Sequence, residues 1–592
     1  MENNINNRLK QVMNWLRMSI YGQDAVYVLI EILAFKSKAK DNEEINGQWA
    51  RFVDPANGRD EQIETIKHTF SMIGWESLYL QRLFVESKEE LVIRDLLSFV
   101  DGLNLNKYGD KIAWELINYF EANYRQAQAP ISLPHELSKL IGELLDLSRE
   151  DSVNCIGEMS AGIALEINSK VNDIRIQTQL SNYLLEMLLT IAGVRAEVIH
   201  SSLSYEAGAE LSNIQFTKSV ILPPWYSRID RDMHRALEFS SFYIKPSSIE
   251  SYYIQKALRN TKSRVVVVMP PGFLFKTAGT DQDLKKYLIE EGLIEGIIKL
   301  PARLFSTTGV MPAVMIINKM NRTDKILFVD ATSEKYYEEV SRSLNKLRNI
   351  ESIIKLILNK EDTSDSRLID NETLRENEYN LDPNRYVLSS EEEKLYKILK
   401  EENTRALGDL VNIKRAQSVK GEEEGSKVKE VNPADIDKTG YLKNPKKEVM
   451  LSIETESKFA KQKLQPGNIV LAVKGSVGRV GMIPEDVENN WYAGQSFVVL
   501  EVKKDSPIKD PIVLYRYLAS DLAQSQLLSK AAGATVKLIK MNDIKSMPII
   551  VPTMEEQDKI IENQRNIERL YQTIEQTNEK ISDLRSEYWG LK

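Results

Sequence analysis

The chain has 592 residues, which is too many for a single hydrophobic core, so we expect three or more domains. Hydrophobic residues make up 42% of the sequence and charged residues 28%, which are the proportions of an ordinary soluble protein. The net charge of −8 excludes a polycationic chain, so any contact with nucleic acid must come from a local basic surface.

A single cysteine, Cys155, excludes a disulfide framework and makes a reducing cytoplasm the expected location. This cysteine and the four histidines show no metal-ligand spacing, so no metal site is expected. The polar, acidic start Met1-Glu2-Asn3-Asn4 argues against a signal peptide. The apolar run 25–30 ends at Glu31, far short of the about 20 residues that span a membrane, so we expect no membrane contact.

The first 125 residues are predicted to be mostly helical. One set of apolar residues recurs near helical spacing: Val26, Leu29, Ile30 and Leu33. Leu91–Val100 forms a second amphipathic pattern, whereas the polar segment between Lys40 and Asp60 contains Gly and Pro and is predicted to be a loop. We expect this region to carry no chemistry of its own and to serve as a partner or DNA-clamping surface.

From about residue 126 to residue 390, short apolar runs alternate with helical patterns. The predicted strands are 152–156, 174–176, 198–199, 219–221, 264–269, 294–300, 313–317 and 326–329. The predicted helices between them are 136–147, 183–191, 247–258 and 281–291. This alternation indicates a largely parallel sheet that is covered on both faces.

One of these strands ends at two prolines, in the sequence Ser219-Val220-Ile221-Leu222-Pro223-Pro224-Trp225. A strand cannot continue through Pro223 and Pro224, so the chain turns there and presents Trp225 at the carboxyl end of the strand. Ligands bind at that edge in open α/β sheets. From these residues alone, a proline-terminated core strand with a surface aromatic is as good an interpretation as a binding site.

The order of the parts over roughly residues 10–390 resembles the methyltransferase subunit of type I restriction–modification systems, in the N6-adenine DNA methyltransferase family. The stretches that carry the resemblance are Leu222–Trp225, Val268–Phe275, Ile297–Ala302, Thr308–Ala313 and Tyr379–Tyr386. The resemblance implies a Rossmann-like methyltransferase sheet, S-adenosylmethionine as the methyl donor, and a flipped-out adenine that stacks on the aromatic residue of an Asn-Pro-Pro-aromatic turn.

Several positions depart from that family's pattern. The residue that should accept a hydrogen bond from the target amine is Leu222, which cannot do so. The cofactor loop starts with Cys155 in place of an acid, and Met159 and Ala161 replace glycines that would let the cofactor approach. The degenerate cofactor loop retains Gly157, Ser160 and Gly162.

The acids that would hold the ribose and the adenine ring have no counterpart in Ile174–Gln179 or His200–Leu203. Because each lost charged hydrogen bond costs about 1.5–3 kcal/mol, we expect no cofactor and no active catalytic residue at Leu222, Pro223, Pro224 and Trp225. The alternative is a register shifted by a few residues, in which Glu158, Asp173 or Glu186 serves. The chain would then be a divergent but active S-adenosylmethionine-dependent N6-adenine DNA methyltransferase.

After the charged connector Glu391–Thr404, the chain changes to short strands rich in lysine and turn residues. The stretches Leu407–Ala416, Leu464–Gly481, Trp491–Phe497, Gly533–Lys540 and Met547–Gln557 resemble one target-recognition domain of a type I specificity subunit. The resemblance covers about residues 400–592 and implies a mixed α/β domain that binds double-stranded DNA in a sequence-specific manner.

A cluster of glycines and basic residues supports this interpretation. Gly475, Gly478 and Gly481 permit a loop pressed close to a ligand, while Lys474 and Arg479 carry charge suited to phosphate. The full set of predicted DNA-binding residues is Lys414, Arg415, Lys474, Gly475, Arg479, Lys537 and Lys540. Because a single lysine is more often just solvated, the prediction rests mainly on Lys474 to Arg479.

The chain ends in a predicted helix with a heptad seam made of Ile567, Leu570, Ile574, Thr577, Ile581 and Leu584. The seam needs a partner, either this chain's own helical region or the same helix of another protomer. We expect a homodimer, or a complex with a methyltransferase, nuclease or translocase subunit through this coiled-coil helix. A two-fold assembly would read a palindromic or split target.

The sequence therefore predicts four parts. They are an N-terminal helical domain (1–125), a methyltransferase-like α/β domain (126–390), a target-recognition domain (391–554) and a C-terminal coiled-coil-type helix (555–592). The predicted function is a sequence-specific DNA-binding component of a bacterial restriction–modification or phage-defence system, in which the methyltransferase fold is a pseudoenzyme. The alternatives are the active methyltransferase and a protein-interaction scaffold that does not contact DNA.

Overall fold

The structure is a computed structural model of the chain. It describes residues 2–19, 24–87, 90–123, 132–178, 183–200, 215–225, 229, 242–276, 279–305, 308–388, 399, 402–417, 421, 424–459, 462–488, 490–531 and 538–587. The chain forms two compact units, Met1–Val387 and Leu388–Lys592. The finer boundaries near residues 125, 390 and 554 stay predictions.

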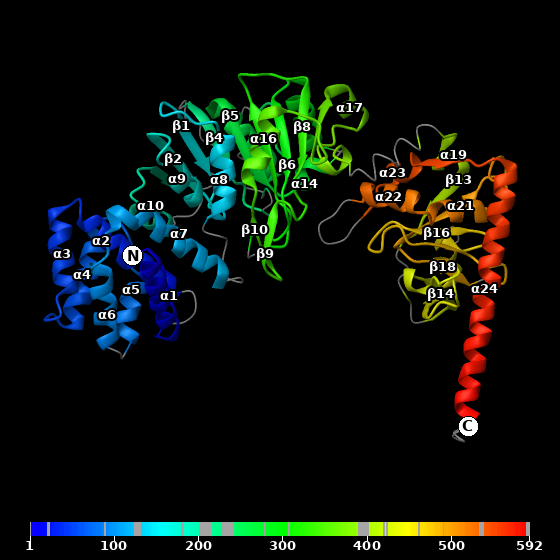
Figure 1. Ribbon diagram of the computed structural model, residues 1–592, viewed down its shortest axis with the longest axis horizontal. Coiled ribbons are helices and arrows are strands. Elements are labelled where there is room, and N and C mark those ends of the chain that lie inside the picture. Colours follow the sequence, from blue (N-terminus) through cyan, green and yellow to red (C-terminus); the bar gives the residue numbers. More distant parts are fainter. Residues whose placement is uncertain are drawn as a thin grey trace. The chain divides into compact units, whose positions relative to one another are not determined.

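The first unit begins with a helical region (blue in Figure 1). Its helices are α1 (Glu2–Ser19), α2 (Asp24–Ala39), α3 (Glu43–Val53), α4 (Arg59–Met72), α5 (Tyr79–Glu86), α6 (Glu90–Asp101) and α7 (Leu105–Asn123). Helix α2 lies at the centre, because every residue from Ala25 to Phe35 is buried. A helix that is apolar all round is one that its neighbours surround.

Helix α3 corrects the prediction of a loop between Lys40 and Asp60. Asn42 caps the helix by accepting hydrogen bonds from the backbone N–H groups of Glu44 and Ile45. The buried residues Ile45, Trp49 and Phe52 lie on one face of the helix. The prediction was wrong because polar residues between these three hid their helical spacing.

The second part of this unit is a nine-stranded sheet with the order β11-β8-β6-β7-β5-β4-β1-β2-β3. The strands are β1 (Ser152–Ile156), β2 (Asp173–Thr178), β3 (Glu197–His200), β4 (Phe216–Ile221), β5 (Thr261–Met269), β6 (Ile294–Lys299), β7 (Ala313–Asn318), β8 (Lys325–Asp330) and β11 (Ser366–Asp370). Only β7 and β11 run antiparallel to their neighbours. The predicted, largely parallel sheet is thus confirmed.

Helices cover both faces of this sheet (Figure 1). One face packs against α8 (His135–Leu144), α9 (Ala161–Ile167) and α16 (Ile350–Asn359). The other face packs against α13 (Ile249–Asn260), α14 (Gly272–Phe275), α15 (Thr280–Glu290) and α17 (Asn371–Glu376). A two-stranded hairpin, β9 (Tyr337–Ser341) and β10 (Leu344–Leu347), and a short turn, η1 (Pro383–Arg385), complete the described elements of this unit.

Helix α10 (Tyr183–Ala192) joins the helical region to the sheet. Its residues Met187, Leu188 and Ile191 belong to the helical core, whereas Leu185 and Leu189 belong to a core of the sheet. Helix α7 approaches so closely that a Cβ on Gly109 would lie 2.1 Å from the carbonyl oxygen of Ile191. The helical region and the sheet therefore share one helix.

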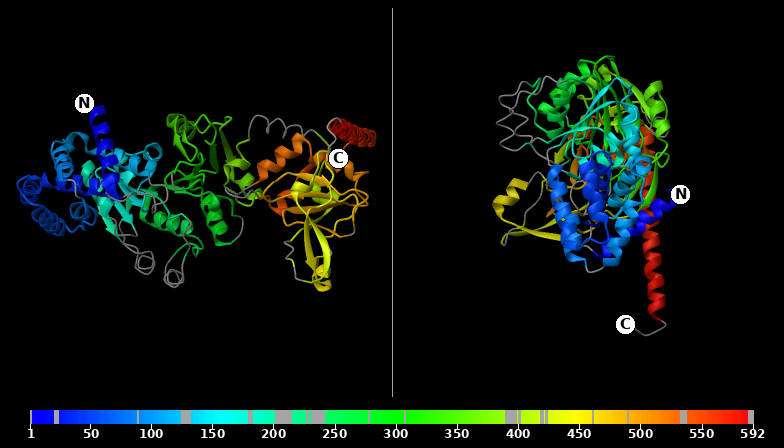
Figure 2. Two further views of the ribbon diagram at one scale, coloured as in Figure 1. Left: turned by 90° about the horizontal axis from the view of Figure 1, so that it is seen from below. Right: turned by 90° about the vertical axis from the view of Figure 1, so that its left-hand side faces the viewer.

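The second unit contains two small sheets. The four-stranded sheet has the order β13 (Val411–Arg415), β19 (Phe497–Val502), β16 (Ile469–Ala472) and β17 (Val480–Met482). The three-stranded sheet has the order β15 (Lys447–Leu451), β14 (Ser426–Val431) and β18 (Trp491–Ala493), and its β14–β15 hairpin projects from the rest of the unit (Figure 2, yellow). A short pair, β12 (Thr404–Ala406) and β20 (Pro548–Ile550), closes the unit.

The helices of this unit are α19 (Leu407–Leu410), η2 (Pro433–Asp435), α20 (Ile453–Phe459), α21 (Pro511–Leu518), α22 (Asp521–Lys530), α23 (Met541–Lys545) and α24 (Met554–Glu587). The start of α24 packs onto the unit through the buried residues Gln557, Ile561 and Gln564. The remainder extends beyond the sheets (red in Figure 1). Across the described ranges, no helix has the length and apolar character of a membrane span.

Candidate functional sites

Two loops of the large sheet meet at the carboxyl ends of neighbouring parallel strands. Strand β1 lies between β2 and β4, and Ile156 is in register with Gln177 on one side and Ile221 on the other. The loop Gly157–Ser160 follows β1, and the turn Leu222–Trp225 follows β4. Because the strand order reverses at β1, this is the point of an open α/β sheet at which a ligand site is expected.

The turn after β4 packs directly onto the loop after β1. The Leu222 N–H donates to the carbonyl of Ile156 at 2.8 Å, and the Leu222 residue is only 1% exposed. Gly157 has φ +132°, and a Cβ there would lie 2.1 Å from the carbonyl oxygen of Leu222. Leu222 therefore occupies the space beside Gly157 and takes part in the core of the sheet.

The rest of the loop is covered from the other side. The Leu133 N–H donates to the carbonyl of Met159 at 3.2 Å, and the buried Ser160 hydroxyl donates to the carbonyl of Gly157 at 2.7 Å. A Cβ on Gly162 would lie 2.4 Å from Ser132 Oγ and 2.9 Å from the Trp114 ring. Both glycines are thus explained by close packing of the chain on itself.

Cys155, which we predict to stand in place of the family's acidic residue, is a neutral group. Cys155 is fully buried at 0% exposure, and this burial raises the pKa of its thiol to about 12. The two residues that we predict to replace glycines, Met159 and Ala161, are also part of the core. Apart from Glu158, these residues of the loop therefore offer a core-like surface to any ligand at the carboxyl edge of β1.

Two of the three possible substitute acids lie elsewhere. Asp173 pairs with Ser152 at the amino end of the sheet, opposite the loop. Glu186 accepts a hydrogen bond from Trp75 Nε1 at 3.1 Å in the helical region. Glu158 does lie on the loop and is partly buried. Gln179 and residues 201–203 lie outside the described residues, so the missing acids at those positions stay predictions.

Trp225 packs against the protein's own aromatic core. Its ring lies 4.8 Å from that of Phe305 at an interplanar angle of 73°, an edge-to-face contact. The Trp225 Nε1 donor is buried and has no hydrogen-bond acceptor among the described residues. Phe305 was not foreseen as a neighbour, because it follows β6 and lies 80 positions further along the sequence.

In the second unit, the predicted basic loop connects β16 to β17. Lys474, Gly475, Ser476 and Arg479 are exposed, and neither Lys474 nor Arg479 forms an ion pair with a described carboxylate. Arg479 Nη2 donates to the carbonyl of Ile436 at 3.2 Å, which orients its guanidinium. The loop is thus a charged surface that is free to meet an anion.

The glycines of this loop serve different purposes. Gly475 has φ +76°, and a Cβ there would meet nothing within 4 Å. Gly478 has φ +87° and is pressed against Gln524, whose side-chain amide donates to the Gly478 carbonyl at 2.8 Å. A Cβ on Gly481 would lie 2.9 Å from Ile436 Cγ1. Helix α22 therefore holds the loop, while Gly475 leaves its tip open.

The structure brings most of the predicted DNA-binding residues to one end of the four-stranded sheet. Arg415 is in register with Val498, which pairs with Leu471 just before the loop. Lys474 bridges Leu538, which places Lys540 near the loop. Lys414 differs from these residues because a carboxylate neutralises it: it forms an ion pair of 2.9 Å with Glu501. Lys537 lies outside the described residues.

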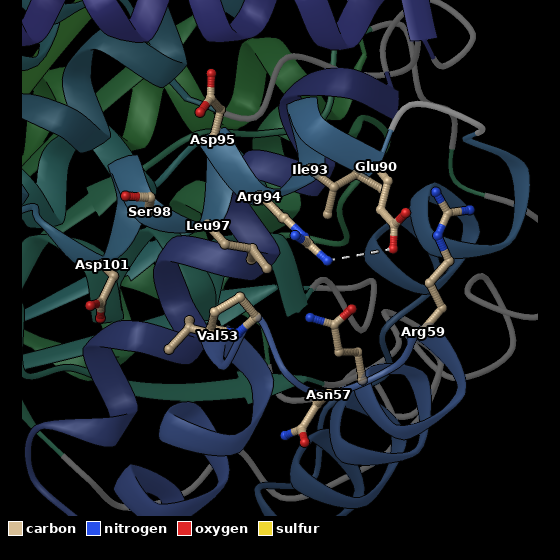
Figure 3. Close-up of a pocket in the computed structure, with 12 residues that line it drawn as sticks. Val53, Asn57, Arg59, Glu90, Ile93, Arg94, Asp95, Leu97, Ser98 and Asp101 are labelled. Atoms are coloured by element: carbon tan, nitrogen blue, oxygen red, sulfur yellow. Dashed lines mark ion pairs between the residues drawn. The ribbon is translucent and has the colours of Figure 1, made fainter.

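A cavity of about 370 Å³ lies in the helical region, between the turn after α3 and helix α6 (Figure 3). Its lining carries both signs of charge. Arg94 extends into it and lies 3.9 Å from Glu90, while Asp101 accepts a hydrogen bond from Trp49 Nε1 at 2.8 Å. Because these groups already engage one another or other parts of the chain, the lining does not select one class of ligand.

Two family models match the chain in the same order as the two units. The model for N-6 DNA methylases matches residues 113–395. The model described as the type I restriction modification DNA specificity domain matches residues 400–583.

Two relatives follow the same division. The chain is 28% identical over 342 residues to the type I restriction enzyme MjaVII methylase subunit of Methanocaldococcus jannaschii, a match that covers 53% of this chain and 58% of the relative. It is 22% identical over 157 residues to the type I restriction enzyme EcoBI specificity subunit of Escherichia coli, covering 26% of this chain and 30% of the relative. The chain thus spans little more than half of the first relative and less of the second.

Among solved structures, the type I restriction-modification system methyltransferase subunit from Streptococcus thermophilus is similar with a TM-score of 0.53 and 17% identity. The match covers 65% of this chain and 99% of that structure, and it supports the fold alone. Residues 113–395 are thus similar to N-6 DNA methylases, and residues 400–583 are similar to the type I restriction modification DNA specificity domain.

Proposed function

We propose that the chain is a sequence-specific DNA-binding component of a bacterial restriction–modification or phage-defence system, with a methyltransferase fold that no longer binds S-adenosylmethionine or transfers a methyl group. The observation that carries the proposal is the packing of Leu222 onto Gly157, with a 2.8 Å hydrogen bond from Leu222 to Ile156. The residue that should accept the target amine is apolar, and its backbone fills the space beside the cofactor loop.

Three observations support the proposed loss of S-adenosylmethionine binding. Cys155 is neutral where the family has an acid, because burial raises the pKa of its thiol. Ser132 and Trp114 pack onto Gly162, so this glycine does not face a ligand. Asp173 and Glu186 are placed where they cannot replace the missing acids, which leaves Glu158 as the one candidate acid on the loop. These residues do not fit S-adenosylmethionine, so no step of the proposed function involves it.

DNA binding is supported by the loop between β16 and β17. Lys474 and Arg479 lie on one exposed loop, and Arg415 lies at the same end of the sheet. Strands lie about 4.8 Å apart, so Arg415 on β13 and Arg479 beside β17 are separated by about 14 Å across the sheet. Such a row of cations suits the phosphates of a duplex, and arginine can also read guanine.

The partner that we propose is a second copy of this chain, bound through α24. The seam residues Leu570, Ile574, Ile581 and Leu584 are 64%, 54%, 42% and 66% exposed. They are therefore not covered by the described residues of this chain, and their heptad spacing suits a matching helix. Pairing would give the assembly two recognition domains and a two-fold or split DNA target.

The DNA interface is tested by the double variant Lys474→Ala/Arg479→Ala. Its affinity for target DNA should fall, and the dependence of the affinity on salt should become shallower by about 0.9 for each lost phosphate contact. Lys504→Ala is the matched control, because Lys504 is exposed and follows the opposite end of β19. Fluorescence anisotropy over a series of salt concentrations measures both quantities. If the double variant and the wild type have equal salt slopes, this loop is not part of the DNA interface. If the wild type has no affinity for DNA, the alternative of a protein-interaction scaffold is favoured.

A second candidate is a divergent, active N6-adenine methyltransferase, which is favoured by the match of residues 113–395 to the N-6 DNA methylase model. Replacing Leu222 by Asn distinguishes the two. In an active enzyme the new acceptor raises the transfer of radiolabelled methyl groups to adenine. In the proposed pseudoenzyme the substitution restores nothing, because the cofactor does not bind.

A further inference from the structure

One arginine at the carboxyl edge of the large sheet has an unusual backbone conformation. Arg303 follows β6 and has φ +59°, in the left-handed region. The other described non-glycine residues with positive φ, Asp146, Asn349, Lys360, Glu378 and Tyr379, all lie at or just beyond the ends of helices. A left-handed backbone at an arginine inside a loop is strained and persists only where the surrounding structure holds it. Such strained residues are frequent at functional sites.

The β9–β10 hairpin holds Arg303 in place. The buried Asn345 donates from its backbone N–H to the Arg303 carbonyl at 2.7 Å, and from its side chain to the Ala302 carbonyl at 2.9 Å. In return, Arg303 Nη1 donates to the carbonyl of Arg342, in the turn of the hairpin, at 2.6 Å. These contacts hold the Arg303 guanidinium against the backbone of Arg342, whose residue is exposed in the hairpin turn.

The two arginines differ in their pairing from the two lysines of the hairpin segment, whereas Arg348 likewise donates to a backbone carbonyl, that of Glu334. Lys335 pairs with Asp365 at 2.6 Å, and Lys346 pairs with Glu136 at 3.0 Å. Neither Arg303 nor Arg342 has a carboxylate within ion-pair distance among the described residues, although Glu338 and Glu339 are exposed on β9. Arg303 and Arg342 thus carry positive charge that no described carboxylate neutralises, which favours the approach of an anion.

Arg303 and Arg342 lie near the same edge of the sheet as the turn after β4. Arg303 is two residues from Phe305, which contacts the ring of Trp225. From β4 to β6 the sheet makes three steps, through β5 and β7, or about 14 Å at about 4.8 Å a step. One DNA strand carries a phosphate every ~3.4 Å along the helix axis, so a strand laid along this edge would place several phosphates between the two points.

We propose that Arg303 and Arg342 bind the phosphate backbone of DNA, so that the methyltransferase-like unit contacts DNA even though its base pocket is closed. The proposal rests on the proposed DNA-binding function of the chain and adds a second, sequence-independent contact to it. Arginine is suited to this contact because its planar fork matches two phosphate oxygens.

The test uses the full chain and the double variant Arg303→Gly/Arg342→Gln. Glycine accepts the left-handed backbone at position 303, so this substitution removes the charge and leaves the turn unstrained. Arg342→Gln alone is the second variant, because Arg342 is exposed in the hairpin turn. The matched control is Lys262→Gln, an exposed cation at the amino end of β5. Thermal unfolding of each variant checks that the fold is intact.

Anisotropy with a duplex that contains the target and long flanks measures affinity against salt. We expect the salt slope to become shallower by about 0.9 for Arg342→Gln and by about 1.8 for the double variant, with Lys262→Gln unchanged. The preference for target over unrelated DNA should stay the same, because the contact carries no sequence information.

If the salt slopes of both variants match that of the wild type, Arg303 and Arg342 do not bind DNA and this proposal is overturned. The proposed DNA-binding function still stands in that case if Lys474→Ala/Arg479→Ala weakens binding. No DNA affinity in the wild type would overturn both. A separate titration with inorganic pyrophosphate distinguishes a small-anion site. If pyrophosphate binds the wild type but not the double variant, and the DNA slopes are equal, the arginine pair binds a small anion and not DNA.

Discussion

At the scale of single residues, Gly157 shows how closely the loop after β1 is packed. Its φ is +132°, and a Cβ at this position would lie 2.1 Å from the Leu222 carbonyl oxygen, so there is no space for a side chain. A glycine that had been retained only for a ligand would face open space. Here the glycine is required by the fold itself, so its presence does not argue for a bound cofactor.

Replacing Gly157 by Ala should therefore destabilise the protein by about 3 kcal/mol or more, because overpacking adds to backbone strain. Gly193→Ala is the control, since Gly193 has φ +71° with nothing within 4 Å of its Cβ position. That change should cost only about 1–2 kcal/mol of strain. Urea unfolding measures both. Equal losses of stability in the two variants would contradict the packing described for Gly157.

Glu31 is a buried acid outside either site. Its carboxylate accepts hydrogen bonds from the backbone N–H groups of Leu78, Tyr79 and Leu80 at the start of α5, and from the hydroxyl of Ser77. Burial nevertheless dominates and raises the pKa of Glu31 to about 7. The folded protein therefore holds this proton more tightly than the unfolded chain does.

Because the pKa of Glu31 is raised in the folded protein, its protonation stabilises the fold. This stabilisation is fully present below the unfolded pKa of 4.5 and is lost as the pH rises through about 7. From mildly acidic to mildly alkaline pH, the free energy of unfolding of the wild type should fall by about 2–3 kcal/mol relative to that of Glu31→Gln, whose side chain does not titrate. Unfolding free energies of both proteins across this pH range test the point. Glu64→Gln, at an exposed helical position, should follow the wild type. A constant difference between wild type and Glu31→Gln would show that the acid is charged throughout.

At the scale of elements, α24 combines an anchored start with an exposed seam. It has 34 residues, or about 51 Å at 1.5 Å per residue, and only its first turns are buried. A helix with four exposed apolar residues at heptad spacing is stable in water chiefly when a partner covers them.

The double variant Leu570→Glu/Ile581→Glu should convert the proposed dimer to a monomer, because each charge would be buried in the seam. Gln572→Glu/Gln576→Glu adds the same charge to the same helix away from the seam, and it should leave the assembly unchanged. Sedimentation velocity gives the mass of each. A monomeric wild type, or a dimer that persists in the seam variant, would remove α24 from the interface.

The sequence predicted eight of the nine strands of the large sheet, all except β11, because buried strands are continuous apolar runs with clear ends. Residues 152–156 were predicted as a strand with the same limits as β1. The pattern failed at α3, and it did not identify the β9–β10 hairpin, whose residues Tyr337–Ser341 are mostly polar or exposed.

The candidate sites were predictable only in part. The residues of the Leu222 turn and of the loop Lys474–Arg479 were found because each forms a continuous stretch. The contacts of Trp225 with Phe305, and of Gly478 with Gln524, join distant parts of the chain and leave no local signal. The pairing of Lys414 with Glu501 likewise depends on strand register, which a single sequence does not specify.

At the scale of the whole molecule, two compact units correspond to the two matched family models. In the first unit, α10 contributes to the helical core through Leu188 and to a core of the sheet through Leu189. The helical region is therefore built into the methyltransferase-like unit and supports the loop after β1 through Trp114. The methyltransferase-like fold is present as a whole, and the proposed loss of function concerns only the polar groups for cofactor and base.

The most direct test of this account is isothermal titration calorimetry of the full chain with S-adenosylmethionine, with and without target DNA. We expect no heat of binding at ligand concentrations well above the micromolar range, and no methyl group on DNA recovered from the mixture. Micromolar binding of S-adenosylmethionine together with transfer of a methyl group to adenine would contradict the account and identify the chain as an active methyltransferase.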